Sequence, residues 1–499
     1  MASAYTDPSI HCRRLAIAGC LLAVVGAKIL LIARLGIPTP YWDQWDAEAV
    51  GLYLPHLSGT LSPAHWFAFH NEHRIVLTRA SALALLWLNG NWDPIVQMLF
   101  NAAVHLVAIG LLLALLGRLL DLASLLFLAA FGLLFFAVPF GWDNTLGGFQ
   151  AQFYYLILLS LISLQLLAHA PAWSPRWLVG TLLAAAGYLA MASGALILPA
   201  AIALAAVQVA TGRRAGAREL AGIALHAAIA VVLLRDALSF SPHAMDRSVG
   251  NVLGSFLASA SWPIAAASWP APARIIPAVL INAPVLILGA RLLAARGKID
   301  DWRWFVLAVA VWLAAQLAAL SFGRPGGTPE SRYNDIFIIG TVLNAAAWLL
   351  LLRTQGAMPY RKFMLWMASI WLFAVMLGAG QKATNNVVDG IAARVRTGQI
   401  QTENVKSFVA TGDFAHLANK PFLHIPYPSA DGLRTLLSDP KLRTILPAAL
   451  TGAGERNALK TAILRHGPML LPLGLALLMF AALAAYLRRE WSADPPQPL

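Results

Sequence analysis

The segment 40–50, PYWDQWDAEAV, gathers acidic side chains directly after a long apolar stretch. Its carboxylates are Asp43, Asp46 and Glu48, a high density for so acid-poor a chain. On a helix, positions 43 and 46 share a face. A carboxylate in a half-dry interface can have a raised pKa and act as a general base. The alternative is a solvated loop, with Trp42 and Trp45 in the aromatic belt of a membrane interface.

A second polar cluster, FHNEHRI, places five polar residues in succession at positions 70–74. Two histidines beside an acid suggest a metal, but the spacing is not that of a His-Glu-x-x-His helix. An arginine suits a phosphate better, because its guanidinium can donate two parallel hydrogen bonds. The alternative is a helix start that these residues cap and solvate. We assign substrate-binding roles, and no metal, to His70, Asn71, Glu72, His73 and Arg74.

Two further polar segments have the composition of a binding site. In GWDNTLGGFQAQFYY, Asp143, Asn144 and Gln150 offer hydrogen-bonding groups beside aromatic rings, a combination suited to sugars. The alternative is a polar loop and a helix start. In GRPGGTPESRYND, arginines on the outer side break the positive-inside trend and therefore need an anionic partner. That partner is either Glu330 or Asp335 of the same loop, or a lipid phosphate. The candidates here are Arg324, Arg332 and Tyr333.

The composition indicates the elements that must position these residues. The chain of 499 residues is 59% hydrophobic and only 12% charged. A soluble domain carries about 25% charged residues, and many apolar runs here reach the ~20 residues that cross a bilayer. The sequence therefore predicts an all-α polytopic membrane protein. The net charge of +13 does not indicate nucleic acid, because Lys and Arg gather at helix ends, where they fix orientation.

Basic clusters mark the cytoplasmic side, and the candidate site residues all lie on the outer side. We predict about twelve crossings, with both termini in the cytoplasm. A single broken helix is the alternative to the fifth and sixth crossings, 177–192 and 195–210. The crossings are 15–36, 95–117, 119–139, 151–168, 177–192, 195–210, 218–239, 275–291, 303–321, 335–352, 363–380 and 468–487.

The apolar stretch 74–90 does not fit as a crossing, because it is short and carries Arg79 near its middle. We predict an amphipathic helix in the membrane interface, with Leu83, Leu86 and Trp87 toward lipid or protein. Region 37–94 is then one large outer loop.

A second outer segment, 380–466, is polar and long enough for a small, mostly helical extracytoplasmic domain. The predicted division is therefore a bundle over 1–379, this domain over 380–466, and a last crossing with a cytoplasmic tail over 467–499.

With its first outer loop opening on WDQWDAE and its many helices, the chain resembles the GT-C superfamily of integral-membrane glycosyltransferases. HNEHR, GFQ and SRY look like motifs of a bacterial branch, and a late periplasmic domain also fits. The resemblance implies a polyprenyl-phosphate or -diphosphate sugar donor and chemistry on the extracytoplasmic side. It makes Asp43 the first choice for the general base and Asp46 the second, since the motif differs from the plain Asp-Asp or Asp-Glu pair.

The expected reaction is a single displacement that inverts the anomeric carbon. The expected partners are the lipid-linked donor, an envelope glycan, lipid or protein acceptor, and membrane lipids, with no nucleic acid. We assign no cofactor and leave a divalent cation open. Two other classes are compatible with the sequence. One is a lipid or glycan transporter or flippase, and the other is a non-catalytic subunit of a polysaccharide assembly system.

Overall fold

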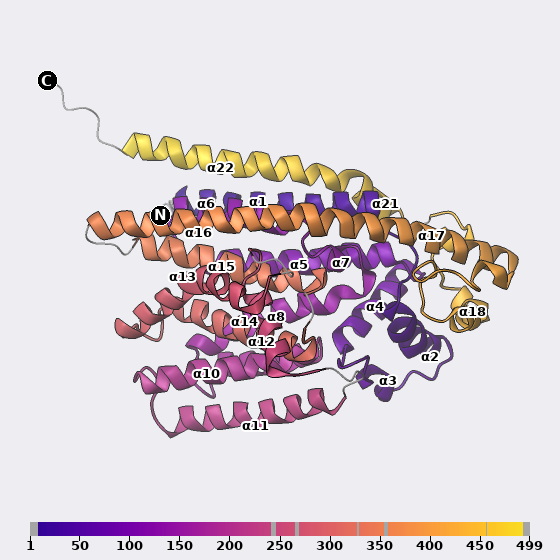
Figure 1. Cartoon of the computed structure of the whole chain (residues 1–499), viewed down its shortest axis with the longest axis horizontal. Helices are drawn as coiled ribbons and strands as arrows, with labels where there is room; N and C mark the ends of the chain where they lie inside the picture. The colour runs from indigo at the N-terminus through magenta and orange to yellow at the C-terminus, as the bar shows by residue number, and fades with distance from the viewer. Residues whose placement is uncertain are drawn as a thin grey trace, which may run out of the picture.

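The computed structural model describes residues 8–240, 246–264, 269–326, 329–353, 358–455 and 457–492. Within these ranges, ten helices are long and apolar enough to cross a membrane, which confirms an all-α, multi-pass membrane protein. Most run along the long axis of the molecule (Figure 1). They correspond to α1 (Pro8–Leu35), α5 (Pro94–Gly117), α8 (Ala151–His169), η3 with α10 (Ala192–Leu196, Ile197–Ala210), α11 (Ala217–Ser239), α13 (Ile275–Ala294), α14 (Arg303–Gly323), α15 (Asn334–Arg353), α16 with α17 (Met358–Lys382, Asp389–Thr411) and α21 with α22 (Ala458–His466, Leu470–Ser492).

Two of the predicted crossings are shorter helices. The prediction 119–139 corresponds to α6 (Leu122–Ala137), and 177–192 corresponds to α9 (Pro175–Tyr188), with 16 and 14 residues. The chain turns tightly after α9 through a short 3-10 turn, Ala192–Leu196, so two helices replace the alternative of one broken helix. The turn needs Gly194, since a Cβ there would lie 2.0 Å from the carbonyl oxygen of Gly187.

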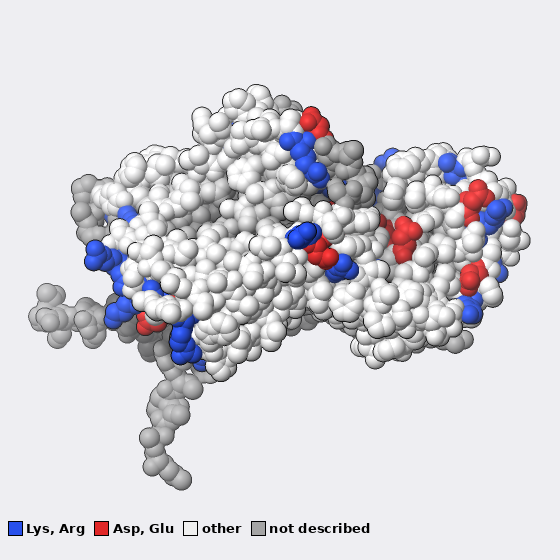
Figure 2. All heavy atoms as spheres, turned by 90° about the horizontal axis from the view of Figure 1, so that it is seen from below, with Lys and Arg blue, Asp and Glu red and all other residues white. Residues whose placement is uncertain are grey.

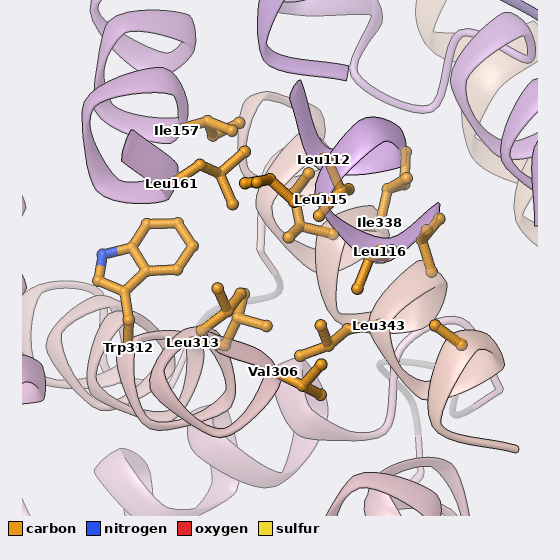
Figure 3. Packing of buried hydrophobic residues seen from close by; sticks show 14 of the residues in the cluster. Leu112, Leu115, Leu116, Ile157, Leu161, Val306, Trp312, Leu313, Ile338 and Leu343 are labelled. Atoms are coloured by element: carbon orange, nitrogen blue, oxygen red, sulfur yellow. The ribbon is translucent and has the colours of Figure 1, made fainter. Parts of the chain in front are cut away.

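The bundle has a wide apolar belt. Figure 2 shows this belt almost free of charged side chains, between mainly basic groups at one end and groups of both signs at the other. At its centre, leucines of α5 pack between α8, α14 and α15 (Figure 3). Leu112, Leu161 and Trp312 are fully buried there. The core thus holds the ends of these helices, and the loops between them, in fixed relative positions.

The first outer loop and the late polar segment form one body at the end of the bundle. The loop contains η1 (Gln44–Tyr53), α2 (Leu54–Leu57), α3 (Pro63–Phe67) and α4 (Val76–Asn89). The late segment contains α17, η7 (Phe414–His416), α18 (Ala430–Ser438), α19 (Pro440–Arg443) and α20 (Ala448–Thr451). Side chains of both, among them Trp45, Trp92, Phe408 and Leu437, share one hydrophobic cluster. The boundary predicted at residue 380 falls inside a helix that continues from α16 into α17.

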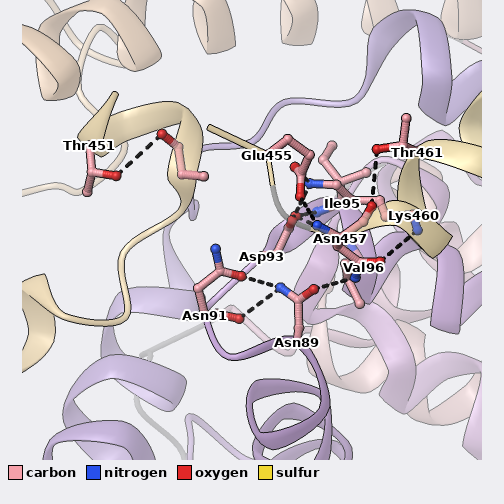
Figure 4. A network of polar contacts seen from close by, with 11 residues as sticks. Asn89, Asn91, Asp93, Ile95, Val96, Thr451, Glu455, Asn457, Lys460 and Thr461 are labelled. Atoms are coloured by element: carbon pink, nitrogen blue, oxygen red, sulfur yellow. Dashed lines mark hydrogen bonds and ion pairs between the residues drawn. The ribbon is translucent and has the colours of Figure 1, made fainter. Parts of the chain in front are cut away.

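Polar contacts join the same two segments where the chain enters and leaves the bundle (Figure 4). Asp93 caps α5 by accepting hydrogen bonds from the amides of Ile95 and Val96 at 2.9 and 3.3 Å. Its other oxygen lies 2.6 Å from Nζ of Lys460 in α21. Asn457 donates to Asn89 at the end of α4. The first loop is therefore tied to the last membrane helix as well as to α5.

The amphipathic stretch forms α4, a helix of 14 residues that ends at Gly90 with φ of 75°. Leu83 and Leu86 pack into the shared hydrophobic cluster, whereas Trp87 is 66% exposed. Arg79 is buried and donates to the carbonyls of Trp66 and Ala68 at 3.0 and 2.7 Å, which ties α4 to α3. The orientation of α4 relative to the membrane stays a prediction.

Candidate functional site

A polar cavity of about 440 Å³ lies where several loops converge at one end of the bundle. It is formed by the segment after α1, the turn 70–73, the turn before α8, the loop between α14 and α15, and α17. Six predicted residues line it: Asp43, Asn71, Asp143, Gln150, Arg324 and Arg332. Thr39, Tyr41, Trp42, Gln44, Trp142, Glu330 and Arg394 also line it.

Asp43 lies at the junction between α1 and η1. The amide of Trp42 donates to the carbonyl of Pro426 at 2.8 Å, with φ of Trp42 at 46°. The Asp43 carboxylate, 37% exposed, lies 3.5 Å from Nε2 of His70. Burial opposes its ionisation, but the hydrogen bond from His70 and the charges of His70 and Arg332 outweigh burial and lower the pKa of Asp43. The raised pKa expected of a general base in this segment is therefore not found at Asp43, which is an ionised proton acceptor at neutral pH.

Asp143 is the second cavity carboxylate, on the short turn α7 (Trp142–Thr145). Its Oδ2 accepts a hydrogen bond of 2.7 Å from Ser331. Burial raises the pKa of Asp143 and outweighs the opposing effects of Ser331 and Arg332. The neighbouring Asn144 does not line the cavity. It is fully buried and donates to the Arg332 carbonyl and to Asp335 at 2.7 and 2.8 Å, so it joins the two loops.

The cavity lining contains three arginines and three acids, and the arginines differ in their partners. Arg332 pairs with Glu330, and Nη2 of Arg324 lies 3.5 Å from Glu72. Arg394 comes from α17, with its guanidinium 4.1 Å from the ring centre of Tyr41. Among the described residues, no carboxylate forms an ion pair with Arg394. The cavity can therefore hold a ligand that carries negative charge.

A mainly apolar groove of about 330 Å³ adjoins this cavity. It follows the ends of α11, α14 and α15 that lie nearest the site, and Arg324 lines both the groove and the cavity. Glu72, His73 and Tyr333 line the groove beside these apolar side chains. Burial lowers the pKa of His73 to about 4, so this ring is neutral. The groove lining includes Met191, Leu196, Leu234, Leu238, Phe240, Leu317, Leu320, Phe322, Ile336 and Phe337.

The turn 70–73 divides its residues between the two spaces. His70 and His73 exchange backbone hydrogen bonds of 2.8 and 3.0 Å, with Asn71 at a φ of 49° between them. Asn71 lines the cavity, and Glu72 and His73 line the groove. Of the candidate residues from these separate segments, Asp43, Asp143 and Arg332 line the same cavity, whereas Glu72 lines the adjoining groove.

Arg74 lines neither space, so its expected contact with a phosphate finds no support here. It forms a bidentate pair with Asp236 of α11, at 2.6 and 2.8 Å, and Tyr188 donates to the same carboxylate. Its guanidinium also stacks on Phe69, at 4.0 Å from the ring centre. With these partners, Arg74 ties the first loop to α11 and α9.

Asp46 and Glu48 also lie outside the cavity. Asp43 is the N-cap of the π-helix η1 and Asp46 lies within it, so the regular helix on which positions 43 and 46 would share a face does not form here. Asp46 is exposed and accepts a hydrogen bond of 2.7 Å from Tyr427. Glu48 is buried and accepts from Gln97, Trp92 and Gln44 at 2.9, 2.7 and 3.3 Å. Burial raises the pKa of Glu48 to about 7, despite these hydrogen bonds.

Arg394 is the functional candidate that the sequence analysis missed. A signal for it exists in GIAARVRTG, where Gly390, Arg394 and Gly398 are spaced four apart and so share a helix face. A Cβ at Gly390 would lie 2.8 Å from Trp142, and one at Gly398 would lie 2.6 Å from Ile37. The two glycines let α17 approach the bundle closely, with Arg394 between them.

Within the described part of the chain, no group of three or more His, Cys, Asp or Glu side chains could hold a metal ion. No family model, curated protein or solved structure matches the chain. The function is therefore argued from the cavity and the groove alone.

Proposed function

We propose that the protein is a membrane glycosyltransferase that moves a sugar from a polyprenyl-linked phosphate or diphosphate to an acceptor on the extracytoplasmic face. The observation that carries this proposal is the shared lining residue Arg324, which joins an apolar groove to a polar cavity containing an ionised carboxylate. A lipid-linked sugar has the matching chemistry, with an apolar chain, a phosphate and a polar sugar in that order.

In the proposed reaction, the polyprenyl chain lies in the groove and its phosphate meets Arg324. Asp43 accepts the proton of the acceptor hydroxyl while that oxygen forms a bond to the anomeric carbon. The bond from the anomeric carbon to the phosphate oxygen breaks, and the lipid phosphate leaves with the electron pair. Arg324 and Arg332 stabilise its developing negative charge, the kind of interaction that lowers such a barrier. One displacement of this kind inverts the anomeric configuration.

We also propose that α6 and α9 cross the bilayer as short helices. The chain then crosses about twelve times, in the bacterial inner membrane, with both termini cytoplasmic. The support is that α6 joins the end of α5 to the turn of Asp143, and that Tyr188 at the end of α9 meets Asp236 at the end of α11. A 16-residue helix is about 24 Å long, which a locally thinned bilayer can accommodate.

A transporter or flippase is the second candidate, and one observation favours it. Lys28 and Asp335 are buried within membrane helices, where ionisable groups often mark transport paths. However, Lys28 donates to Thr145 at 3.0 Å, and Asp335 accepts from Asn144. Both groups thus support the turn of Asp143, which suits a fixed site.

The proposal is tested with purified protein in lipid nanodiscs and a polyprenyl-phosphate sugar labelled in the sugar. Transfer predicts acceptor-dependent release of unlabelled polyprenyl phosphate. Movement of intact donor between leaflets, without bond cleavage, would instead identify a flippase. A protein that does neither with a range of envelope acceptors would be a non-catalytic subunit, and the proposal would fail.

A further inference from the structure

We propose that the acceptor is an acidic glycan whose anionic group binds Arg394. The role of this ligand as the acceptor rests on the proposed function. The binding site itself is defined by the cavity. The chemical class is a sugar ring that carries a carboxylate or a phosphate.

Arg394 provides the anion-binding group. It lines the cavity, and no carboxylate forms an ion pair with it among the described residues, whereas Arg324 and Arg332 face Glu72 and Glu330. Its Nη1 donates weakly to Gln401 Oε1 at 3.3 Å, and Gln401 is itself anchored to the Leu423 carbonyl at 2.7 Å. The Tyr41 ring supports the flat side of the guanidinium. The group is thus held in place near the charge of Asp143 but without a direct ion pair, so its hydrogen-bond donors remain available to an anionic ligand.

The remaining walls suit a sugar ring. Trp42 and Trp142 provide aromatic surfaces, and Asn71 and Gln150 provide amide groups around the same space. Aromatic side chains offer large, flat apolar contacts, and precisely placed polar groups set orientation in such pockets. The volume of about 440 Å³ lies within the ~300–1,000 Å³ typical of ligand sites.

The position of Arg394 separates its ligand from the donor phosphate. Arg324 is the arginine that the groove and the cavity share, and Arg394 does not line the groove. Arg394 instead belongs to α17, beside the late polar segment. There, Phe422 is 77% exposed and packs edge-on against Trp42, with ring centres 6.0 Å apart. The aromatic surface of the cavity therefore continues outward, along a route that a longer glycan chain can follow.

The test measures binding of small sugars to the full chain in nanodiscs by saturation-transfer NMR at pH 7 and low salt. The probes are methyl glucuronide for a carboxylate, glucose 6-phosphate for a phosphate, and methyl glucoside as the neutral sugar. We expect at least one acidic probe to bind about tenfold or more tighter than the neutral sugar, as a charge-assisted hydrogen bond provides. Arg394→Gln should reduce this preference to about twofold or less. Arg394→Lys keeps the positive charge but loses the paired guanidinium donors, so it should retain part of the preference.

Arg396→Gln is the matched control, since Arg396 is exposed on the same helix and does not line the cavity. It should leave the preference unchanged. Equal binding of neutral and acidic sugars by the natural protein overturns the inference, as does an equal loss in Arg396→Gln. If Arg394→Gln does not fold, comparison of Arg394→Lys with Arg396→Lys decides in the same way. Because no probe is a donor, selective binding without any glycosyl transfer would contradict the proposed function and leave this binding site standing.

Discussion

At the scale of single residues, the cavity holds two carboxylates whose environments shift their pKa values in opposite directions. Asp43 faces His70 and Arg332, which lower its pKa, whereas burial raises the pKa of Asp143. When two neighbouring acids have pKa values shifted in opposite directions, they can take different roles in a reaction. Asp43 loses its proton at the lower pH and is the base of the proposed reaction, in which Asp143, held by Ser331, orients a sugar hydroxyl.

This assignment predicts the pH dependence of transfer. The Asp43 pKa lies below the ordinary value of about 3.9, so the acid limb of the rate should lie below about pH 4. His70→Gln removes a hydrogen bond and a positive charge, so that burial, opposed mainly by Arg332, should raise the Asp43 pKa. The acid limb should then move to higher pH, as measured by kcat/KM. His416→Gln, outside the cavity, should not move it, and an unmoved limb in His70→Gln would contradict the role of Asp43.

Glu48 predicts a pH dependence of stability. Its pKa is about 7 in the folded protein, above the ordinary 4.5. Between these values the folded state holds one proton more than the unfolded state, so stability should fall as pH rises, by about 1.4 kcal/mol per pH unit. Glu48→Gln should remove this slope in thermal unfolding from pH 5 to 7. Asp46→Asn, exposed on the same helix, should keep it; a slope that survives in Glu48→Gln would show that another group causes it.

At the scale of elements, the sequence predicts helix bounds best for long, regular apolar helices such as α5, α8 and α14. It predicts the structure least well where the backbone is not a regular α-helix. The π-helix η1 moves Asp46 away from Asp43, and this winding has no signature in WDQWDAE. The change to polar composition near residue 380 suggested a domain boundary, yet α16 continues into α17, because Gly390 and Gly398 pack that helix against the bundle.

The close packing at these glycines predicts the effect of a larger side chain. Gly398→Val should push α17 away from Ile37, displace Arg394 and destabilise the protein by about 1–3 kcal/mol, the usual cost of overpacking. The preference for acidic sugars should fall together with the thermal stability. Gly380→Ala is the control, because no atom lies within 4 Å of a Cβ at that helical position. It should be neutral or stabilising, as alanine favours helix. An unaffected Gly398→Val would show that close packing of α17 does not position Arg394.

At the scale of the whole molecule, most of the segments that form the cavity are recognisable in the sequence. Their positions relative to one another are not. Asp43, Asp143 and Arg332 were found because acids and arginines are rare outside the basic helix ends. The groove could not be found, since its leucines and phenylalanines look like any other membrane helix surface until three helices are brought together. For the same reason, the pairing of Arg74 with Asp236 appears only in the folded chain.

The proposed topology predicts that the two ends of the molecule face different compartments. Thr60→Cys, exposed in the first outer loop, should react with a membrane-impermeant thiol reagent in intact cells. Lys298→Cys, exposed between α13 and α14, should react only after permeabilisation. The native Cys12 and Cys20 are buried and give the background. Equal labelling of both positions in intact cells would contradict the prediction that they lie on opposite sides of the membrane.

The central claim is that Asp43 takes the proton in a transfer from a lipid-linked sugar, and its most direct test is the single-turnover rate of labelled polyprenyl-phosphate sugar in two matched variants. Asp43→Asn keeps the shape of the side chain and removes the proton acceptor, so the rate should fall by about 10²–10⁴-fold while donor binding survives. Asp46→Asn makes the same change three residues away, on the exposed side that contacts Tyr427, and should keep nearly full activity. A fully active Asp43→Asn, or a dead Asp46→Asn beside it, would contradict the account.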